Sequence, residues 1–117
     1  MKPASARAKG KRLEYDVAAL LRSKDLDKDA KRMPLSGAFS HMPGDIYTRL
    51  PYHFECKNQE RIQLWDWWEQ AKGQALRVPP VLVISGNYRP VVAVVDIDLL
   101  LNLLKIEQDY LADVRER

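Results

Sequence analysis

Apolar residues recur at helical spacing in three segments of the chain, namely 10–24, 62–76 and 98–111. In the first segment, Leu13, Val17 and Leu21 lie four residues apart, which is the spacing of one face of an amphipathic helix. Asp96 or Asp98 can cap the third segment, because an aspartate carboxylate accepts hydrogen bonds from the first free N–H groups of a helix. The pattern therefore predicts three helices.

Short runs of β-branched and aromatic residues alternate with these helices and predict strands. They occupy 31–35, 45–50, 52–57, 80–85 and 90–96. Pro51 joins the second and third runs, so we expect an antiparallel hairpin there. The last two runs are separated by a turn at 86–89 and are apolar throughout, so we expect both of their faces to be buried.

This order of elements predicts one mixed α/β domain, with a central sheet flanked by helices. The chain has 117 residues, which is enough for one hydrophobic core and short for two. Residues 1–10 are expected to form a basic, flexible arm in front of this domain.

Charge is spread unevenly along the chain. The first twelve residues contain five Lys or Arg and no acid, whereas acids outnumber bases from Asp96 onwards. A basic arm on a near-neutral body indicates attraction to a polyanion such as nucleic acid. A solvated, disordered terminus explains the arm equally well.

Cys56 is the single cysteine, which excludes an internal disulfide and fits a reducing compartment. No segment resembles a signal peptide, and Pro, Asp and Asn interrupt the longest apolar runs. We therefore expect a soluble protein of the cytoplasm.

The expected hairpin places two acids opposite each other. With its turn centred near Leu50, Asp45 lies across from Glu55, and opposed residues have Cβ atoms about 4.5–5.5 Å apart. Two carboxylates that close repel each other unless a cation lies between them. Carboxylate oxygens suit Mg²⁺ or Mn²⁺, and the backbone carbonyl of Cys56 can add a further ligand. The register therefore predicts a metal site.

Lys57 shares a strand face with Glu55, because side chains alternate along a strand. A lysine beside a metal-bound water adds positive charge where negative charge develops on a scissile phosphate, and it can orient or deprotonate the nucleophile. These groups together are the set needed to hydrolyse a phosphodiester. A Glu-x-Lys sequence on its own is more often a solvent-facing ion pair.

The ordered set Gly-Asp and then Glu-Cys-Lys resembles the PD-(D/E)XK nuclease signature, with Asp45, Glu55 and Lys57 in its three core positions. The resemblance implies a restriction-endonuclease-like αβββαβ core, which agrees with the predicted order of elements. It also implies an acid from the first helix, and Glu14 occupies that place. Helical spacing alone does not distinguish Glu14 from Asp16.

Within this superfamily, residues 9–85 are similar to archaeal-type Holliday junction resolvases, including versions carried by phages. Arg32, Ser36 and Gly37 occupy the loop of that pattern, which is longer here, so that either Ser36 or Ser40 matches its serine. The resemblance implies a magnesium-dependent homodimer that makes paired symmetric nicks in four-way DNA junctions during recombination and repair. Its location would be the nucleoid, or the host cytoplasm for a phage protein.

The resemblance also implies a role for each site residue. Glu14, Asp45, Glu55 and the Cys56 carbonyl would hold Mg²⁺, and Lys57 would complete the catalytic set. The residues expected to bind DNA are Lys9, Lys11, Arg12, Arg32, Ser36 and Gln59. Gln59 is also an ordinary polar residue before a helix, and Ser36 an ordinary turn former.

Two other functions stay open. The same motif would serve a restriction-type or repair nuclease that cuts duplex, flapped or single-stranded DNA, because the motif sets the reaction and not the DNA shape. A catalytically idle DNA-binding module on a nuclease fold is the third interpretation, and the intact acids and lysine argue against it. His41 and His53 lack cysteine partners at zinc-ligand spacing, although His53 can contact substrate.

Two surfaces are candidates for the homodimer contact. Trp68 belongs to an apolar stripe and is expected in the core, whereas Trp65 and Trp67 cannot both share that face. An exposed tryptophan among charged residues typically marks an interface. The apolar helix at 98–111 offers the second surface.

Overall fold

The computed structural model of the chain describes residues 6–33 and 45–116. The elements within these residues are, in order, α1 (Ala6–Ser23), β1 (Lys31–Arg32), β2 (Ile46–Tyr47), β3 (His53–Asn58), α2 (Leu64–Gln74), β4 (Pro80–Ser85), β5 (Val92–Val94) and α3 (Ile97–Arg115). The predicted mixed α/β class is confirmed. The part from α1 to β4 has the αβββαβ order of a restriction-endonuclease-like core.

The main sheet has the strand order β3-β4-β5. Strands β3 and β4 are parallel, and α2 joins them, because parallel neighbours need a crossover connection. Strand β5 returns antiparallel to β4 through the turn at 86–89, where Tyr88 has a left-handed φ of 58°.

The predicted hairpin between 45–50 and 52–57 is wrong in its pairing. Strand β2 pairs instead with β1, in a separate two-stranded antiparallel sheet. A backbone hydrogen bond of 3.0 Å, from the N–H of Asp45 to the carbonyl of Phe54, joins this small sheet to β3. The two acid-bearing segments are therefore neighbours without forming a regular ladder.

The carboxylate of Asp27 holds the chain that follows β2. Its Oδ2 atom accepts hydrogen bonds from the hydroxyl of Thr48 at 2.7 Å and from the N–H of Arg49 at 2.8 Å. These bonds draw the chain that follows β2 towards the loop after α1. The N–H of Arg49 is therefore not available to a hairpin ladder.

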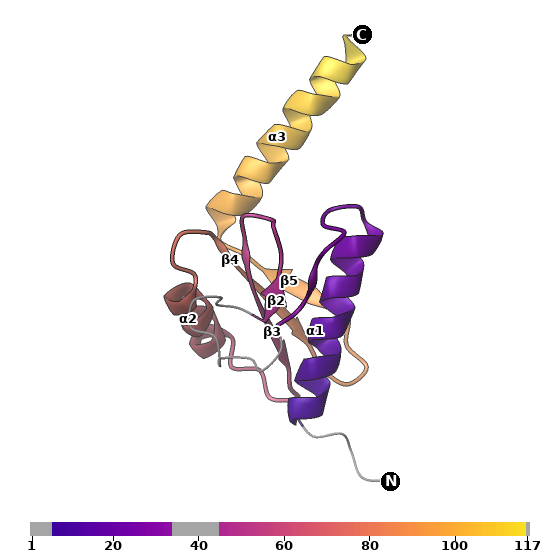
Figure 1. The fold of residues 1–117 in the computed structure, drawn as a ribbon. Coiled ribbons are helices and arrows are strands. Elements are labelled where there is room, and N and C mark those ends of the chain that lie inside the picture. The colour runs from indigo at the N-terminus through magenta and orange to yellow at the C-terminus, as the bar shows by residue number, and fades with distance from the viewer. Residues whose placement is uncertain (1–5, 34–44, 117) are drawn as a thin grey trace.

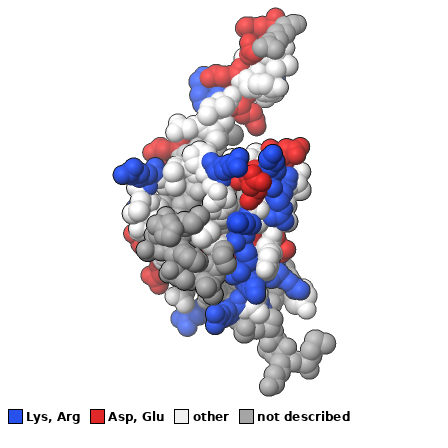
Figure 2. All heavy atoms as spheres, viewed as in Figure 1, with Lys and Arg blue, Asp and Glu red and all other residues white. Residues whose placement is uncertain are grey.

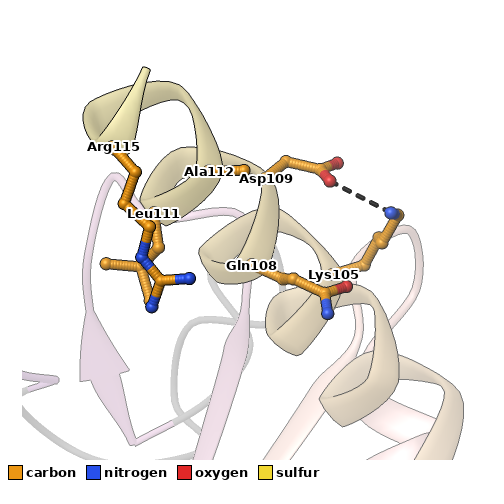
Figure 3. Close-up of a pocket in the computed structure, with 6 residues that line it drawn as sticks. All are labelled: Lys105, Gln108, Asp109, Leu111, Ala112 and Arg115. Atoms are coloured by element: carbon orange, nitrogen blue, oxygen red, sulfur yellow. Dashed lines mark ion pairs between the residues drawn. The ribbon is translucent and has the colours of Figure 1, made fainter. Parts of the chain in front are cut away.

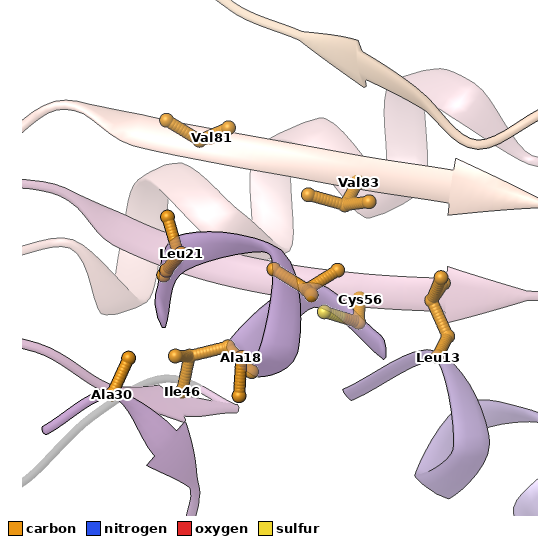
Figure 4. Packing of buried hydrophobic residues seen from close by; sticks show 9 residues of the cluster. Leu13, Ala18, Leu21, Ala30, Ile46, Cys56, Val81 and Val83 are labelled. Atoms are coloured by element: carbon orange, nitrogen blue, oxygen red, sulfur yellow. The ribbon is translucent and has the colours of Figure 1, made fainter. Parts of the chain in front are cut away.

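Helix α1 covers one face of the main sheet, and Figure 4 shows its apolar side chains against β3 and β4. The buried cluster consists of Leu13, Val17, Ala18, Leu21, Ala30, Ile46, Cys56, Val81 and Val83. Helix α2 lies on the opposite face (Figure 1), where Leu82 of β4 is fully buried. The sheet is thus enclosed on both sides at β3 and β4.

The buried face of α2 differs by one residue from the predicted one. Trp67 and Ala71 are buried, whereas Trp68, which was expected in the core, is half-buried. Trp65 is 73% exposed. This confirms the expectation that at least one of Trp65 and Trp67 lies outside the core. The face of α2 that packs depends on how the helix lies against β3 and β4. The spacing of three nearby tryptophans in the sequence does not reveal this orientation.

Helix α1 begins at Ala6, so the part of the predicted arm from residue 6 to Gly10 is helical. Lys9 helps to anchor this first part of the helix, because its Nζ lies 3.7 Å from Oε1 of Glu60. Residues 1–5 of the arm lie outside the described residues.

The last predicted strand and the last predicted helix form, but the strand is not buried on both faces as expected, and the helix does not flank the sheet. Asp96 caps α3 by accepting a hydrogen bond of 2.8 Å from the N–H of Asp98. Helix α3 nevertheless extends away from the sheet (Figure 1), and none of its described residues is buried. Val92 of β5 is also 45% exposed. Because α1 and α2 already occupy the two faces at β3 and β4, β5 becomes an open edge.

Within the described residues, no helix combines the length and the apolar character that crossing a membrane requires.

Candidate active site

Asp45 lies where the small sheet meets β3. Its N–H donates to the carbonyl of Phe54 at 3.0 Å, and its Oδ2 accepts a hydrogen bond of 2.7 Å from the N–H of Cys56. The carboxylate therefore takes the place that a backbone carbonyl would have in the next step of a ladder. Asp45 is buried, so its position is set by the backbone of β3.

Glu55 projects from β3 on the face opposite α1. Alternation along the strand puts His53, Glu55 and Lys57 on this face, as predicted, while Cys56 joins the α1 core. Oε1 of Glu55 lies 2.9 Å from Nε2 of His53, and both side chains are almost fully buried. This acid–histidine pair was not predicted, because the sequence offers no sign that α2 closes over that face.

Glu14 faces the sheet from α1. It is buried, whereas Asp16 is exposed, so the two acids that helical spacing left open differ clearly in the structure. Oε2 of Glu14 accepts a hydrogen bond of 2.9 Å from Nε of Arg32. The Arg32 guanidinium also lies 5.3 Å from the ring centre of Tyr15. Arg32, expected to bind DNA, is thus engaged within the protein in this structure.

The three acids Asp45, Glu14 and Glu55 all affect the thiol of Cys56. Burial raises the pKa of the Cys56 thiol, and the negative charges of Asp45, Glu14 and Glu55 raise it further. Such electrostatic effects require short distances, because charge interactions weaken with separation. The three carboxylates therefore lie within electrostatic range of the thiol, with Glu14 on the α1 side of β3 and Glu55 on the opposite side.

The donor chemistry of this region fits a hard divalent cation. In residues 6–33 and 45–116, no three His, Cys, Asp or Glu side chains lie close enough together to enclose an ion. A full protein cage is not needed for magnesium, which usually binds through one or two carboxylates and keeps several waters. Asp45 and Glu55 suit this mode, because Cys56 N–H and His53 each hold one of their oxygens in place.

The other predicted site residues of this part of the chain lie on β3, directly after it, or outside the described residues. Lys57 is half-buried on the strand face that carries Glu55. Gln59 follows β3, and its N–H donates to the carbonyl of Ser85 at 3.3 Å. Ser36, with the neighbouring loop residues 34–44, lies outside the described residues.

Basic side chains gather on the face of the molecule over α1, as Figure 2 shows. Within α1, Lys11 and Arg12 are exposed and Lys9 is half-buried. Positive charge on one face is the electrostatic footprint of a protein that binds nucleic acid.

A comparison with models of protein families gives a match. The family described as "Phage putative PDDEXK endonuclease" matches residues 5–114, a range that contains every acid of the site and Lys57. Comparisons with curated proteins and with solved structures give no significant match. The ordered acids, the αβββαβ core and this match agree, and the chain belongs to this family of phage PD-(D/E)XK endonucleases.

Proposed function

We propose that the chain hydrolyses DNA phosphodiester bonds with Mg²⁺, for which Mn²⁺ can substitute, and that it resolves four-way junctions. The observation that supports the chemistry most directly is the fixed position of the Asp45 carboxylate on the N–H of Cys56, between Glu55 and Lys57 in sequence. Membership of an endonuclease family supports the same reaction class.

Asp45 and Glu55 would hold the metal ion, with Glu14 and the carbonyl of Cys56 as further oxygen donors. When bound, such an ion neutralises charge on a phosphate oxygen and lowers the pKa of a bound water. The contribution of the chain is preorganisation. The Cys56 N–H and His53 orient the two carboxylates before substrate arrives.

Lys57 would act on the scissile phosphate. Its half-buried position on the Glu55 face reduces the screening of its charge by water, so that its attraction to a phosphate oxygen is stronger than at an open surface. Negative charge that develops in the transition state is stabilised by such a group, and the ammonium can also orient the attacking water.

The basic face over α1 supports a phosphate backbone as the ligand. A four-way junction has two strands to cut that are related by near two-fold symmetry. Two active sites in a symmetric homodimer meet that geometry. Recognition would then depend on DNA shape and backbone contacts more than on base identity.

A panel of labelled substrates tests the proposal. Four-way junction, duplex, flap and single strand are incubated with the protein and Mg²⁺ or Mn²⁺. We expect paired symmetric nicks in the junction, which disappear in Asp45→Asn and Lys57→Ala while binding persists. Glu14→Gln should also lose cleavage, whereas Asp16→Asn, an exposed acid two residues away, should keep it. A folded protein that cuts none of the four substrates with either ion would contradict the proposal.

The family description names an endonuclease without a DNA shape, which favours a second candidate, a nuclease that cuts duplex, flapped or single-stranded DNA. Preferred cleavage of one of those substrates in the same panel would select it. Calorimetry separates both from an idle DNA-binding module, which would take up neither metal ion.

A further inference from the structure

Tyr88 lies at the tip of the turn between β4 and β5, in a conformation that its residue type rarely adopts. Its φ is 58°, and its side chain is fully exposed. A left-handed φ is uncommon outside glycine, and for a bulky residue it is a clear outlier. Asp25 has a similar φ of 57°, but a short polar side chain tolerates it by bonding locally. A ring in solvent does not stabilise the core, so folding does not explain this tyrosine. Such outliers are typical of functional sites.

The backbone of this turn is held at several points. The N–H of Arg89 donates to the carbonyl of Gly86 at 3.2 Å and closes the turn. The hydroxyl of Ser85 donates to the carbonyl of Arg89 at 3.4 Å. The N–H of Asn87 donates to Oε1 of Glu60 at 2.6 Å. The exposed ring is thus presented from a fixed backbone, which reduces the conformational entropy that binding a ligand would cost.

The turn lies close to two parts of the proposed DNA-binding site. Strands β3 and β4 are parallel and pair Lys57 with Ile84, so the turn, which begins at Gly86, lies at the end of the sheet that carries Lys57. Glu60 connects the turn to α1, because its Oε1 also lies 3.7 Å from Nζ of Lys9. Figure 1 shows the turn beside the amino-terminal half of α1. DNA that contacts both α1 and Lys57 would therefore meet the turn.

The side chains near the ring suit a nucleic acid. Arg89, the next residue, is exposed, as are Lys11 and Arg12 on α1. Nucleobases stack on exposed aromatic rings, while neighbouring cations contact the phosphates that join them. An exposed tyrosine followed by an exposed arginine provides both kinds of contact.

We propose that Tyr88 stacks on a DNA base that is left unstacked at a branch point, and that Arg89 contacts the adjoining phosphate. Within a continuous duplex, both faces of a base are covered by its neighbours, so a projecting ring finds no free face. Where strands separate, at a junction or a flap, one face is free and an unpaired base can rotate outwards. The ring therefore favours branched DNA over plain duplex. This inference rests on the proposed function, because it takes DNA as the substrate, and it names the residue that selects the DNA shape.

Helix α3 carries a second exposed tyrosine, in acidic surroundings. Tyr110 is 65% exposed, and the segment 97–116 contains five acids and two bases. Figure 3 shows a shallow hollow on this helix, where the ammonium of Lys105 is already paired with Asp109 at 3.0 Å. A phosphate backbone would be repelled by this helix. Tyr110→Asn is therefore the matched control, because it removes an exposed ring without changing the turn.

Binding without metal tests the stacking, because no strand is cut. Fluorescence anisotropy in EDTA gives the affinity of the full chain for a labelled junction, flap and duplex. In Tyr88→Asn we expect affinity for the junction and the flap to fall about 5–150-fold, which is the effect of losing one stacked base, and affinity for the duplex to stay unchanged. Tyr88→Phe, which keeps the ring, and Tyr110→Asn should bind as the native chain does. Native affinity of Tyr88→Asn for the junction, or an equal loss on all three substrates, would overturn the proposal.

The choice of asparagine separates binding from folding. Asparagine tolerates a left-handed φ, so the thermal midpoint of Tyr88→Asn should equal or exceed that of the native chain. A clearly lower midpoint would show that the ring supports the fold, and this would overturn the proposal by giving Tyr88 a structural reason.

Photochemical cross-linking tests which base is stacked. On irradiation, 5-iodouracil couples to an aromatic side chain that lies against it. Placed at the branch point of a junction, it should cross-link to Tyr88, which mass spectrometry of the digested product identifies. Placed in the middle of a duplex arm, it should not. The absence of a branch-point cross-link to Tyr88 would overturn the proposal.

Arg89→Gln tests the phosphate contact. Loss of one contact should reduce the salt slope of junction binding by about 1. Arg77→Gln is the control, because Arg77 is also exposed but precedes β4 and so lies at the other end of that strand. An unchanged slope in Arg89→Gln would overturn the contact.

The stacking and the proposed nuclease activity can fail separately. A chain that binds branched DNA through Tyr88 but cuts nothing with Mg²⁺ or Mn²⁺ would count against the nuclease proposal alone. A chain that cuts the junction, and whose Tyr88→Asn variant cuts it with the same KM, would overturn the stacking alone.

Discussion

The Oδ2 atom of Asp45 accepts a hydrogen bond of 2.7 Å from the backbone N–H of Cys56. A side chain that would bind metal is thereby fixed to the strand that carries the other site residues. The carboxylate of Asp45 has two roles, because it carries a negative charge and it also accepts this hydrogen bond. Different substitutions can remove these two roles one at a time.

Asp45→Asn and Asp45→Ala should therefore behave differently. Asparagine keeps a carbonyl oxygen that can accept from Cys56 N–H, so the variant should unfold near the native midpoint while Mn²⁺ binding is lost. Alanine leaves a buried N–H without an acceptor, which costs about 1–3 kcal/mol of unfolding free energy. Chemical denaturation and calorimetry measure the two effects. Equal stability of the two variants would show that the hydrogen bond contributes little.

His53 should act as a positioning residue for Glu55, because its Nε2 lies 2.9 Å from Oε1. Loss of a group that orients a metal ligand typically lowers metal affinity 10–100-fold. We expect that loss of Mn²⁺ affinity for His53→Ala, with a smaller loss for His53→Gln, whose amide N–H can still donate. Titration calorimetry gives both values. Unchanged affinity in His53→Ala would exclude the role.

Arg32 and Lys11 should contribute to different properties. Arg32 is paired with buried Glu14, so Arg32→Ala should lower the unfolding free energy by about 1–3 kcal/mol. Lys11 is exposed, so Lys11→Ala should leave stability unchanged, weaken binding to all DNA shapes alike and reduce the salt slope by about 1. Thermal melts and binding at several salt concentrations distinguish them. A salt slope reduced by about 1 in Arg32→Ala, with unchanged stability, would instead make Arg32 a phosphate contact.

Asp27 should make the stability of the folded chain depend on pH. The hydrogen bond from the Thr48 hydroxyl, followed by that from the Arg49 N–H, lowers the pKa of Asp27 below its ordinary value of 3.8. A lowered folded-state pKa contributes stability above the unfolded value, and this contribution disappears as pH falls through the folded one. The native chain should exceed Asp27→Asn in stability at pH 6, with the difference shrinking below pH 3.8. Urea unfolding at several pH values measures it, with Asp25→Asn, at an exposed acid, as the control.

Cys56 should be unreactive in the folded protein. Its thiol is buried and its pKa is raised by burial and by the surrounding carboxylates, so little thiolate forms near neutral pH. A thiol reagent at pH 8 should label the chain only after urea unfolds it. Rapid labelling of the native chain would show that β3 opens readily.

Much of the fold follows from the pattern of apolar and polar residues along the chain. Apolar runs of strand length placed β4 at its observed bounds, and helical spacing placed Leu13, Val17 and Leu21 against the sheet. These features depend on local periodicity. The pairing of β2 with β1 does not, and the chain after β2 is held by the carboxylate of Asp27, which lies about twenty residues earlier in the chain.

The candidate site was predictable in its residue types and not in its contacts. Asp45, Glu55 and Lys57 stand in an order that resembles a nuclease signature, and the family match agrees with it. The partners that hold them, namely the Cys56 N–H and His53, come from how β3 is enclosed. Neither a hydrogen bond to a backbone N–H nor a buried side-chain pair can be predicted from residue spacing.

The parallel pairing of β3 with β4 has a consequence for biosynthesis. The proposed catalytic residues all precede Asn58, yet the strand that carries two of them is bordered by a segment that is made only after α2. During translation, the acids therefore leave the ribosome before the neighbour that encloses them. A growing chain would therefore not assemble the proposed site until β4, which ends at Ser85, has been made and the sheet can close.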